Sequence, residues 1–340
     1  MSELGTQFAD SIQNISPENP HSGIVLHYSQ PMREYIQDSP EQWNAEINKL
    51  MLQHGAIVFR GFKVDKVEIL EKFVSDISNF GRNSLIPYEG ERASPRSLIS
   101  SYTYTSTEYE ATNSIFIHNE MSSRMSWPRK LYFYCHKKSE QGGNTPICNI
   151  RKVTQDISDE VVDLFKENDI KYIRNYGGRF GVNIEYGFGT KDKSEVEKYC
   201  DTNDIQYEWI GDEHLRTSFC RPAFETHPIS KEELWFNYAT FYDVNSVDAK
   251  VSSLLKRMTK PEERSFAAMF ANGETISDEI FDYFRSLYTK YTYEFDWANG
   301  DILALDNMLY GHGRQPYSGE RSVWVVMAEE THRTGTNRES

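Results

Sequence analysis

Apolar side chains recur at two different spacings in the early part of the chain. Over residues 40–53 they follow the three- and four-residue spacing of one helix face, through Trp43, Ile47, Leu50 and Met51. A short apolar run between glycines follows at residues 55–62, GAIVFRGF, and is typical of a buried strand. Helical spacing returns over residues 67–80, through Leu70, Phe73, Val74 and Ile77. We therefore expect helix, strand and helix in that order, after a polar and loosely ordered segment at residues 1–22.

Short strands dominate the middle and the end of the chain. The runs that predict them are apolar, mostly aromatic or β-branched, and bounded by turn residues: KLYFYCHK (130–137), NTPICNI (144–150), ELWFNYATFY (233–242), GDILALDN (300–307) and RSVWVVMAE (321–329). Capped helices are predicted between them, at residues 158–168, 194–200 and 277–288. This pattern predicts a mainly β fold, with a jelly-roll or related double-sheet core and flanking helices.

The chain shows no internal repeat, no low-complexity tract and no linker rich in Pro, Gly or Ser. We therefore expect a single domain over residues 23–332, followed by a C-terminal tail at 333–340. The least regular part is the segment 175–221, which is rich in glycine, tyrosine and charged residues. Because long irregular segments inside compact domains often cover a site, we expect a lid-like insertion there.

The composition of the chain argues against two classes of binding partner. The net charge of −14 argues against nucleic acid and against an anionic membrane surface, since both require a cationic face. No apolar stretch approaches the roughly 20 residues of a membrane span, and the N-terminus has no signal-peptide pattern. The four cysteines form no CxxC pair and are expected to be free thiols. We expect a cytoplasmic protein with a small-molecule substrate, and no oligomeric state is indicated.

One histidine and one glutamate stand two residues apart in SIFIHNEMSS, residues 114–123. Residues i and i+2 of a strand point to the same face, so His118 and Glu120 are expected to project together. If that face lines the interior of a barrel, these polar groups need partners, and a metal ion is one such partner. Taken alone, H-x-E on a strand is a weak signal.

A third candidate metal ligand, His312, lies in the GHG motif near the end of the chain. Gly311 and Gly313 flank His312, which leaves the backbone free to approach a neighbour closely. Nine residues later, Arg321 begins an apolar strand and shares a face with Val323 and Val325, so an inward guanidinium with an anionic partner is expected. The other seven histidines are interpreted as surface or satisfied core residues.

Two histidines and one carboxylate form the facial triad of non-haem iron(II) oxygenases. The triad leaves open coordination positions that an α-keto acid and O2 can fill. Arg321 would then supply the cation for the far carboxylate of that keto acid. A zinc-dependent hydrolase could use the same three ligands but would not need Arg321. A non-catalytic jelly-roll binding protein, with the triad as a structural remnant, also remains open at this point.

The motifs and their order resemble the TauD/TfdA superfamily. They are H-x-E at 118–120, GGNTPICNIRKV at 142–153 and DNMLYGHGRQPYSGERSVWVVMA at 306–328. Within that superfamily the sequence is most similar to the SyrP-like and clavaminate synthase-like branch, and the likeness runs over most of the chain. The resemblance implies a double-stranded β-helix (jelly roll), Fe(II), and 2-oxoglutarate and O2 as co-substrates.

Carried over by position, the resemblance also implies the roles of individual residues. His118, Glu120 and His312 match the iron ligands, and Thr145 and Arg321 match the residues that hold the distal carboxylate of 2-oxoglutarate. Related halogenases have Ala or Gly in place of the carboxylate ligand, so Glu120 favours hydroxylation or another oxidative outcome. The implied reaction converts 2-oxoglutarate to succinate and CO2.

The resemblance further implies the substrate class. Members of this branch often act on amino acids or their derivatives, free or bound to a carrier protein, in antibiotic and other specialised-metabolite biosynthesis. We therefore expect hydroxylation of an aliphatic carbon in such a substrate. Arg124 and Arg314 are near the ligands in sequence and are expected either to bind the substrate or to form salt bridges at the barrel mouth.

Overall fold

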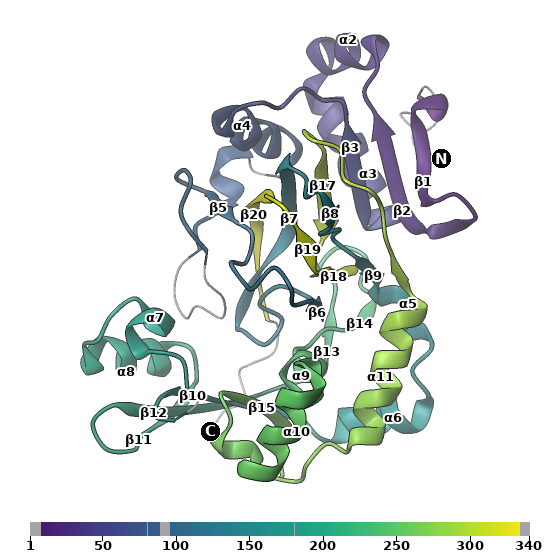
Figure 1. The fold of residues 1–340 in the computed structure, drawn as a ribbon. Helices are drawn as coiled ribbons and strands as arrows, with labels where there is room; N and C mark the ends of the chain where they lie inside the picture. The colour runs from purple at the N-terminus through teal and green to yellow at the C-terminus, as the bar shows by residue number, and fades with distance from the viewer. Residues whose placement is uncertain (1–7, 80, 89–95, 180, 334–340) are drawn as a thin grey trace.

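The largest sheet of the computed structural model has eight strands and runs through the centre of the molecule (Figure 1). The structure describes residues 8–79, 81–88, 96–179 and 181–333. The strand order is β1-β2-β3-β17-β7-β20-β4, with β5 beside β20. Their bounds are β1 Ile12–Ser16, β2 Asn19–His27, β3 Ala56–Arg60, β4 Leu85–Ile86, β5 Thr103–Thr105, β7 Ser126–Lys137, β17 Ile302–Asp306 and β20 Ser322–His332.

A four-stranded sheet faces this one and completes the jelly roll. Its order is β16-β9-β18-β6, with bounds β6 Ile115–His118, β9 Ile147–Asn149, β16 Thr292–Tyr293 and β18 Tyr310–Arg314. Ile117 and Ile147 of this sheet share one apolar core with Phe133 and Val325 of the larger sheet. The mainly β fold with a jelly-roll core and flanking helices is therefore confirmed.

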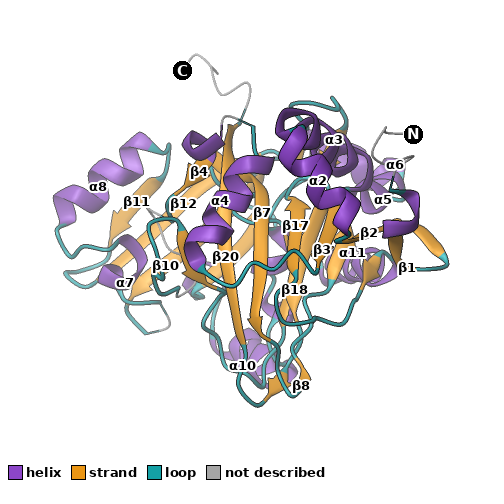
Figure 2. Ribbon diagram, turned by 90° about the horizontal axis from the view of Figure 1, so that it is seen from above, coloured by secondary structure: helices purple, strands orange, loops and turns teal. Residues whose placement is uncertain are grey.

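Both faces of the large sheet are covered, which explains why its central strands are apolar at nearly every position. In β7, Leu131 and Phe133 belong to the core between the sheets, whereas Tyr132 and Tyr134 face the helices. The covering helices are α2 Gln30–Asp38, α3 Pro40–His54 and α4 Val67–Ile77, as Figure 2 shows. The expected order of helix, strand and helix is thus confirmed.

The remaining helices and short strands lie at the other end of the jelly roll and around its rim (Figure 1). They are α5 Ile150–Gln155, α6 Asp159–Glu167, α9 Ala239–Tyr242, α10 Ala249–Met258, α11 Asp278–Lys290, β8 Gln141–Gly142, β13 Phe224–Thr226, β14 Glu233–Trp235 and β19 Tyr317–Ser318. Trp235 of β14 stacks on Phe284 of α11 at 4.0 Å between ring centroids, which fixes this helix against the core.

The segment 175–221 is regular, so its interpretation as irregular chain was wrong. It contributes to a third sheet with order β11-β12-β10-β15, which projects beside the jelly roll together with two short helices (Figure 1). The bounds are α7 Ile184–Phe188, α8 Lys193–Thr202, β10 Ile170–Gly177, β11 Gln206–Trp209, β12 His214–Arg221 and β15 Phe266–Phe270. In β12 the buried positions alternate with more exposed ones, and two of the outward positions, His214 and Arg216, obscured the strand pattern. The lid role of this segment stays a prediction.

Two other expectations were wrong in the described part of the chain. Residues 12–22 are not loosely ordered, because β1 pairs with β2 from Ile12↔Leu26 to Ser16↔Asn19. The run ELWFNYATFY is a strand only at β14 and then turns into α9, where the side chain of Asn237 accepts the Ala239 N–H. Residues 1–7 and 334–340, which include nearly all of the expected tail, lie outside the described residues.

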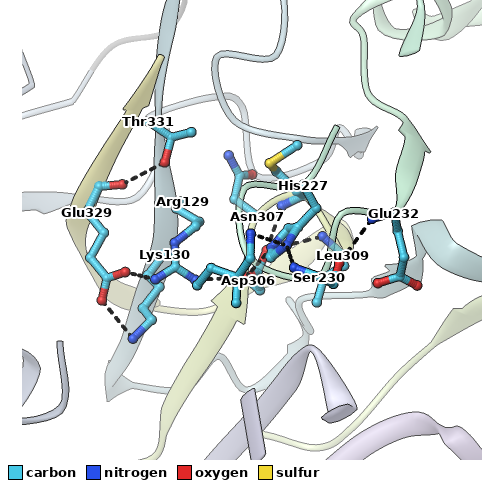
Figure 3. A network of polar contacts seen from close by, with 12 residues as sticks. Arg129, Lys130, His227, Ser230, Glu232, Asp306, Asn307, Leu309, Glu329 and Thr331 are labelled. Carbon is cyan, nitrogen blue, oxygen red and sulfur yellow. Dashed lines mark hydrogen bonds and ion pairs between the residues drawn. The ribbon is translucent and has the colours of Figure 1, made fainter. Parts of the chain in front are cut away.

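A buried network of charged side chains lies at one end of β7, β17 and β20 (Figure 3). Arg129 pairs with Asp306 and Glu329, and Lys130 lies 2.8 Å from Glu329. His227 Nδ1 accepts a backbone N–H from Ser230, so its Nε2 carries the proton and donates to Asp306 at 3.1 Å. We call these five residues, Arg129, Lys130, His227, Asp306 and Glu329, the charge network.

Candidate active site

The fold brings His118, Glu120 and His312 together from two distant parts of the chain. His118 ends β6, and His312 lies opposite it on β18 in the antiparallel register. One potential ligand atom from each of the three residues lies within 4.8 Å of the others, and all three side chains are largely buried. A side chain at Gly313 would place its Cβ 2.6 Å from the Ile115 carbonyl, so glycine permits this close approach of β18 to β6.

Both imidazoles are neutral, and a hydrogen bond orients that of His118. His118 Nδ1 lies 2.8 Å from the Phe116 carbonyl, so it donates its N–H there and leaves a lone pair on Nε2. Burial lowers the pKa of His118 and, together with the neighbouring His118, lowers the pKa of His312 well below its usual value. Both rings can therefore offer a lone pair to a metal ion at neutral pH.

Glu120 lies just beyond the strand rather than within it, because β6 ends at His118. Its backbone is held by the side chain of Asn307, which accepts the Glu120 N–H at 2.7 Å and donates to the Glu120 carbonyl at 2.9 Å. Asn307 also donates to the Pro128 carbonyl. The sequence did not single out Asn307 as a site residue, so its positioning of Glu120 was missed.

The carboxylate of Glu120 pairs with a residue that the sequence did not single out. Arg96 Nη2 lies 2.7 Å from Glu120 Oε2, and the same oxygen lies 3.9 Å from His312 Nε2. Burial alone would raise the pKa of Glu120, but Arg96 and the two histidines outweigh it and lower this pKa to about 2. Arg96 stands in a polar stretch with no local pattern that would have marked it.

A pocket beside the triad contains the residues expected to hold 2-oxoglutarate. Its lining includes His118, His312, Thr145, Arg321 and Arg96. Arg321 Nε donates to the Gly143 carbonyl at 2.9 Å, and the Thr145 hydroxyl accepts from Trp297 Nε1 at 3.3 Å. Burial, with a further contribution from Arg314, lowers the pKa of Arg321 to about 10, so the guanidinium stays charged at neutral pH.

The two other arginines that drew attention in the sequence have different surroundings. Arg314 lines the pocket, and its guanidinium donates to the carbonyls of Tyr109, Glu110 and Asn113 rather than to a carboxylate of the described residues. Its role in substrate binding stays a prediction. Arg124 lines a second, very small cavity on another side of Glu120, together with Arg174 and Tyr238.

The donor set fits a divalent transition metal. Two neutral imidazoles and one ionised carboxylate form the ligand type that non-haem iron(II) uses, and none of the three is held by a full set of protein hydrogen bonds. His312 Nδ1 is buried without a hydrogen-bond partner among the described residues. Aromatic rings surround the histidines: Phe241 lies 4.8 Å from His118, and Phe133 lies 4.8 Å from His312, between ring centroids.

Comparisons with known proteins point to one family. The family model described as "Taurine catabolism dioxygenase TauD, TfdA family" matches residues 28–327. The dapdiamide synthesis protein DdaC of Enterobacter agglomerans is 34% identical over 286 residues, covering 84% of this chain and 85% of that protein. A clavaminate synthase-like protein of Arabidopsis thaliana is 27% identical over 294 residues, covering 83% of this chain and 84% of that protein.

Solved structures agree on the fold. AAD-2, solved with Mn(II) and N-oxalylglycine, superposes with a TM-score of 0.56 at 13% identity, covering 95% of this chain and 98% of that one. PvcB of Pseudomonas aeruginosa superposes with a TM-score of 0.53 at 14% identity, covering 93% of this chain and 88% of that one. In the described part of the chain, no helix has the length and apolar character needed to cross a membrane.

Proposed function

Because this chain belongs to the TauD/TfdA family of Fe(II)- and 2-oxoglutarate-dependent dioxygenases, we propose that it hydroxylates an aliphatic carbon of an amino acid or an amino-acid-derived substrate. Fe(II), 2-oxoglutarate and O2 are the cofactor and co-substrates. The similarity to a protein named for dapdiamide synthesis supports a role in antibiotic or other specialised-metabolite biosynthesis. The substrate is a small molecule, free or presented by a carrier protein, and the reaction is cytoplasmic.

His118, Glu120 and His312 are the proposed iron ligands. The observation that carries this assignment is the convergence of their potential ligand atoms within 4.8 Å, from strands that are almost 200 residues apart in sequence. The hydrogen bond from His118 to the Phe116 carbonyl orients the first ring, and Asn307 fixes the backbone of Glu120. When bound, iron supplies the redox chemistry that couples decarboxylation of 2-oxoglutarate to oxidation of a C–H bond.

Thr145 and Arg321 are the proposed residues for the distal carboxylate of 2-oxoglutarate. Both line the pocket beside the triad, and the buried guanidinium of Arg321 suits a carboxylate because its planar fork can donate two parallel hydrogen bonds. The rings of Phe133 and Phe241 exclude water from the histidines, which protects the reaction from unproductive turnover.

Hydroxylation is favoured over halogenation because position 120 carries a carboxylate. An anionic ligand there fills the coordination position that a halide would need.

The segment 175–221 remains the proposed lid, and its sheet with α7 and α8 projects beside the jelly roll (Figure 1). Slow hydrogen exchange over this segment, unchanged by substrate, would contradict the lid assignment.

The test of this function is a turnover screen on the Fe(II)-loaded protein. Succinate formation is followed with 2-oxoglutarate, O2 and a panel of amino acids, their amides and carrier-bound forms, and products are analysed for the addition of one oxygen atom. We expect succinate formation to rise with one substrate class and to match the hydroxylated product. If the protein binds Fe(II) and 2-oxoglutarate but yields chlorinated product with chloride, hydroxylation is the wrong outcome.

A further inference from the structure

Arg96 carries a buried guanidinium that is only partly satisfied. The side chain is 3% exposed, and its one ion pair joins Nη2 to Glu120 Oε2 at 2.7 Å. The guanidinium also lies over the Tyr88 ring, with Cζ 4.9 Å from the ring centroid. Nε and Nη1 are nevertheless buried without a hydrogen-bond partner among the described residues, so their three N–H bonds have no hydrogen-bond acceptor there. Because an unmet buried donor costs free energy, this arrangement indicates that the guanidinium has another partner in the working enzyme.

The ion pair also uses an oxygen that faces the proposed metal position. Glu120 Oε2 lies 3.9 Å from His312 Nε2, so the carboxylate oxygen closest to this histidine is also the one that Arg96 holds. A metal ion bound by Glu120 and His312 would place a second positive charge next to this guanidinium. A metal ion and a guanidinium on the same buried oxygen repel each other, so binding of metal favours a shift of Arg96 away from Glu120 Oε2.

The pocket that contains Arg96 matches the charge of 2-oxoglutarate. Arg96 and Arg321 both line it, Arg96 beside the triad and Arg321 near Thr145. The third arginine of the lining, Arg314, donates to three backbone carbonyls through Nη1 and Nη2, and only its Nε has no partner among the described residues. 2-Oxoglutarate has a carboxylate at each end, and a cation is present for each of them.

We propose that Arg96 is a positioning residue with two successive partners: it neutralises Glu120 before metal binds, and it then holds the 2-oxoglutarate carboxylate nearest to the metal. This inference rests on the proposed metal site at His118, Glu120 and His312. The exchange keeps both the glutamate and the guanidinium paired in each state, which explains why a buried cation next to a metal ligand is tolerated.

The test measures two affinities on the full chain, with Mn(II) as the metal probe and 2-oxoglutarate as the second ligand. In Arg96→Gln we expect Mn(II) to bind about tenfold more tightly, the factor expected if the competent state is populated about one-tenth of the time in the parent protein. 2-Oxoglutarate should bind to the Mn(II)-loaded variant about 10- to 100-fold more weakly, as expected for the loss of a charged hydrogen bond. A merely structural role would weaken both.

Two outcomes would overturn the proposal. Unchanged or weaker Mn(II) binding in Arg96→Gln would show that Arg96 does not compete with the metal, and unchanged 2-oxoglutarate affinity would show that its second partner lies elsewhere. If Arg96→Gln does not fold, the same two affinities are measured on Arg96→Lys. Lysine keeps the positive charge but lacks the planar guanidinium, so 2-oxoglutarate should bind about tenfold more weakly while Mn(II) affinity changes little. The opposite pattern contradicts the proposal.

Two control variants separate this inference from the proposed function. Arg285→Gln removes a guanidinium of α11 that pairs with Asp243 and Asp282 and does not line the pocket, so both affinities should stay at the parent values. In chloride-free buffer, where no halide can replace the carboxylate, Glu120→Ala should weaken Mn(II) binding strongly. If Mn(II) binds equally well to Glu120→Ala, the proposed metal site is wrong; if binding is weakened there but unchanged in Arg96→Gln, only the role of Arg96 is wrong.

Discussion

Two clusters of buried charge lie within one residue of each other on the chain, and they differ in how completely their members are paired. Asp306 belongs to the charge network, where Arg129, Lys130 and His227 donate to acidic partners (Figure 3). Asn307 belongs to the active site, where Arg96 and His312 have buried nitrogen atoms without partners among the described residues. Burial and charge are common to both, so neither property alone distinguishes a site from a structural network.

The two clusters differ in how many of their hydrogen-bond donors and acceptors lack a partner. Glu329 of the charge network pairs with Arg129 and Lys130 and also accepts the Asn79 N–H at 2.8 Å, so it has little capacity left. Glu120 has a single cationic partner and faces two imidazole rings that can accept a metal. Closed networks stabilise the fold, whereas open ones retain the capacity to bind ligands. Variants in the two clusters should therefore fail in different ways.

The largest effect is expected for Glu120→Ala. Iron would lose its only anionic protein ligand, so hydroxylation should fall by at least about a thousandfold, in line with the loss of an essential catalytic group. Turnover is measured as hydroxylated product, with circular dichroism to verify the fold. Full hydroxylase activity in this variant would show that Glu120 is not a ligand.

Arg321→Ala should have the next largest effect. Loss of one member of a buried charge pair costs roughly 3–5 kcal/mol, which corresponds to two to four orders of magnitude in 2-oxoglutarate affinity. Metal binding should remain nearly intact, and Arg321→Lys should recover only part of the loss because lysine lacks the fork. The measurement is an anaerobic titration of the metal-to-2-oxoglutarate charge-transfer band. Unchanged affinity would mean that another cation holds the distal carboxylate.

Glu329→Gln tests whether the charge network stabilises the fold rather than binding a ligand. The change leaves Lys130 without its carboxylate and Arg129 with Asp306 alone, so we expect the free energy of unfolding to fall by about 3 kcal/mol, at the lower end for a broken buried pair. Mn(II) affinity should not change, since among the described residues no side chain of the charge network contacts the side chains of the three proposed metal ligands. Urea unfolding and Mn(II) titration provide the two measurements. A variant with parental stability but weakened metal binding would reverse the assignment of the two clusters.

The smallest effect concerns the thiols. Cys135, Cys148 and Cys200 are buried, and burial raises the pKa of Cys135 and Cys148 to about 12, so these two remain protonated at neutral pH. Cys220 is exposed. Under native conditions a chromogenic disulfide reagent should react quickly with one thiol, and Cys220→Ser should remove that reaction without loss of metal binding. Rapid reaction of a second thiol would indicate opening of the core.

The sequence predicted those parts of the molecule whose signals are local. β7 and β20 were found because they are covered on both faces and therefore read as apolar runs. His118, His312 and Arg321 were found because spacing and flanking glycines mark them within a few residues. The projecting sheet was missed because the outward positions of β12 include His214 and Arg216, and its buried positions only alternate with the outward ones.

The contributions of Arg96 and Asn307 depend on contacts that no local pattern encodes. Arg96 meets Glu120 across 24 residues of sequence, and Asn307 meets it across 187. Such contacts arise when distant strands are brought into register, so a single sequence offers no periodicity or motif from which to infer them. They are therefore visible only in the folded structure.

The position of β20 has a consequence for biosynthesis. This strand pairs with β7, β5 and β4. These three strands are synthesised earlier and stay without this pairing until residues 322–332 have been made. Until β20 emerges from the ribosome, β7 presents a long apolar edge that can pair with other chains. Folding of the jelly roll is thus completed only after residues 322–332 have been synthesised. A nascent or truncated chain that ends before Arg321 exposes this edge and is therefore prone to aggregate.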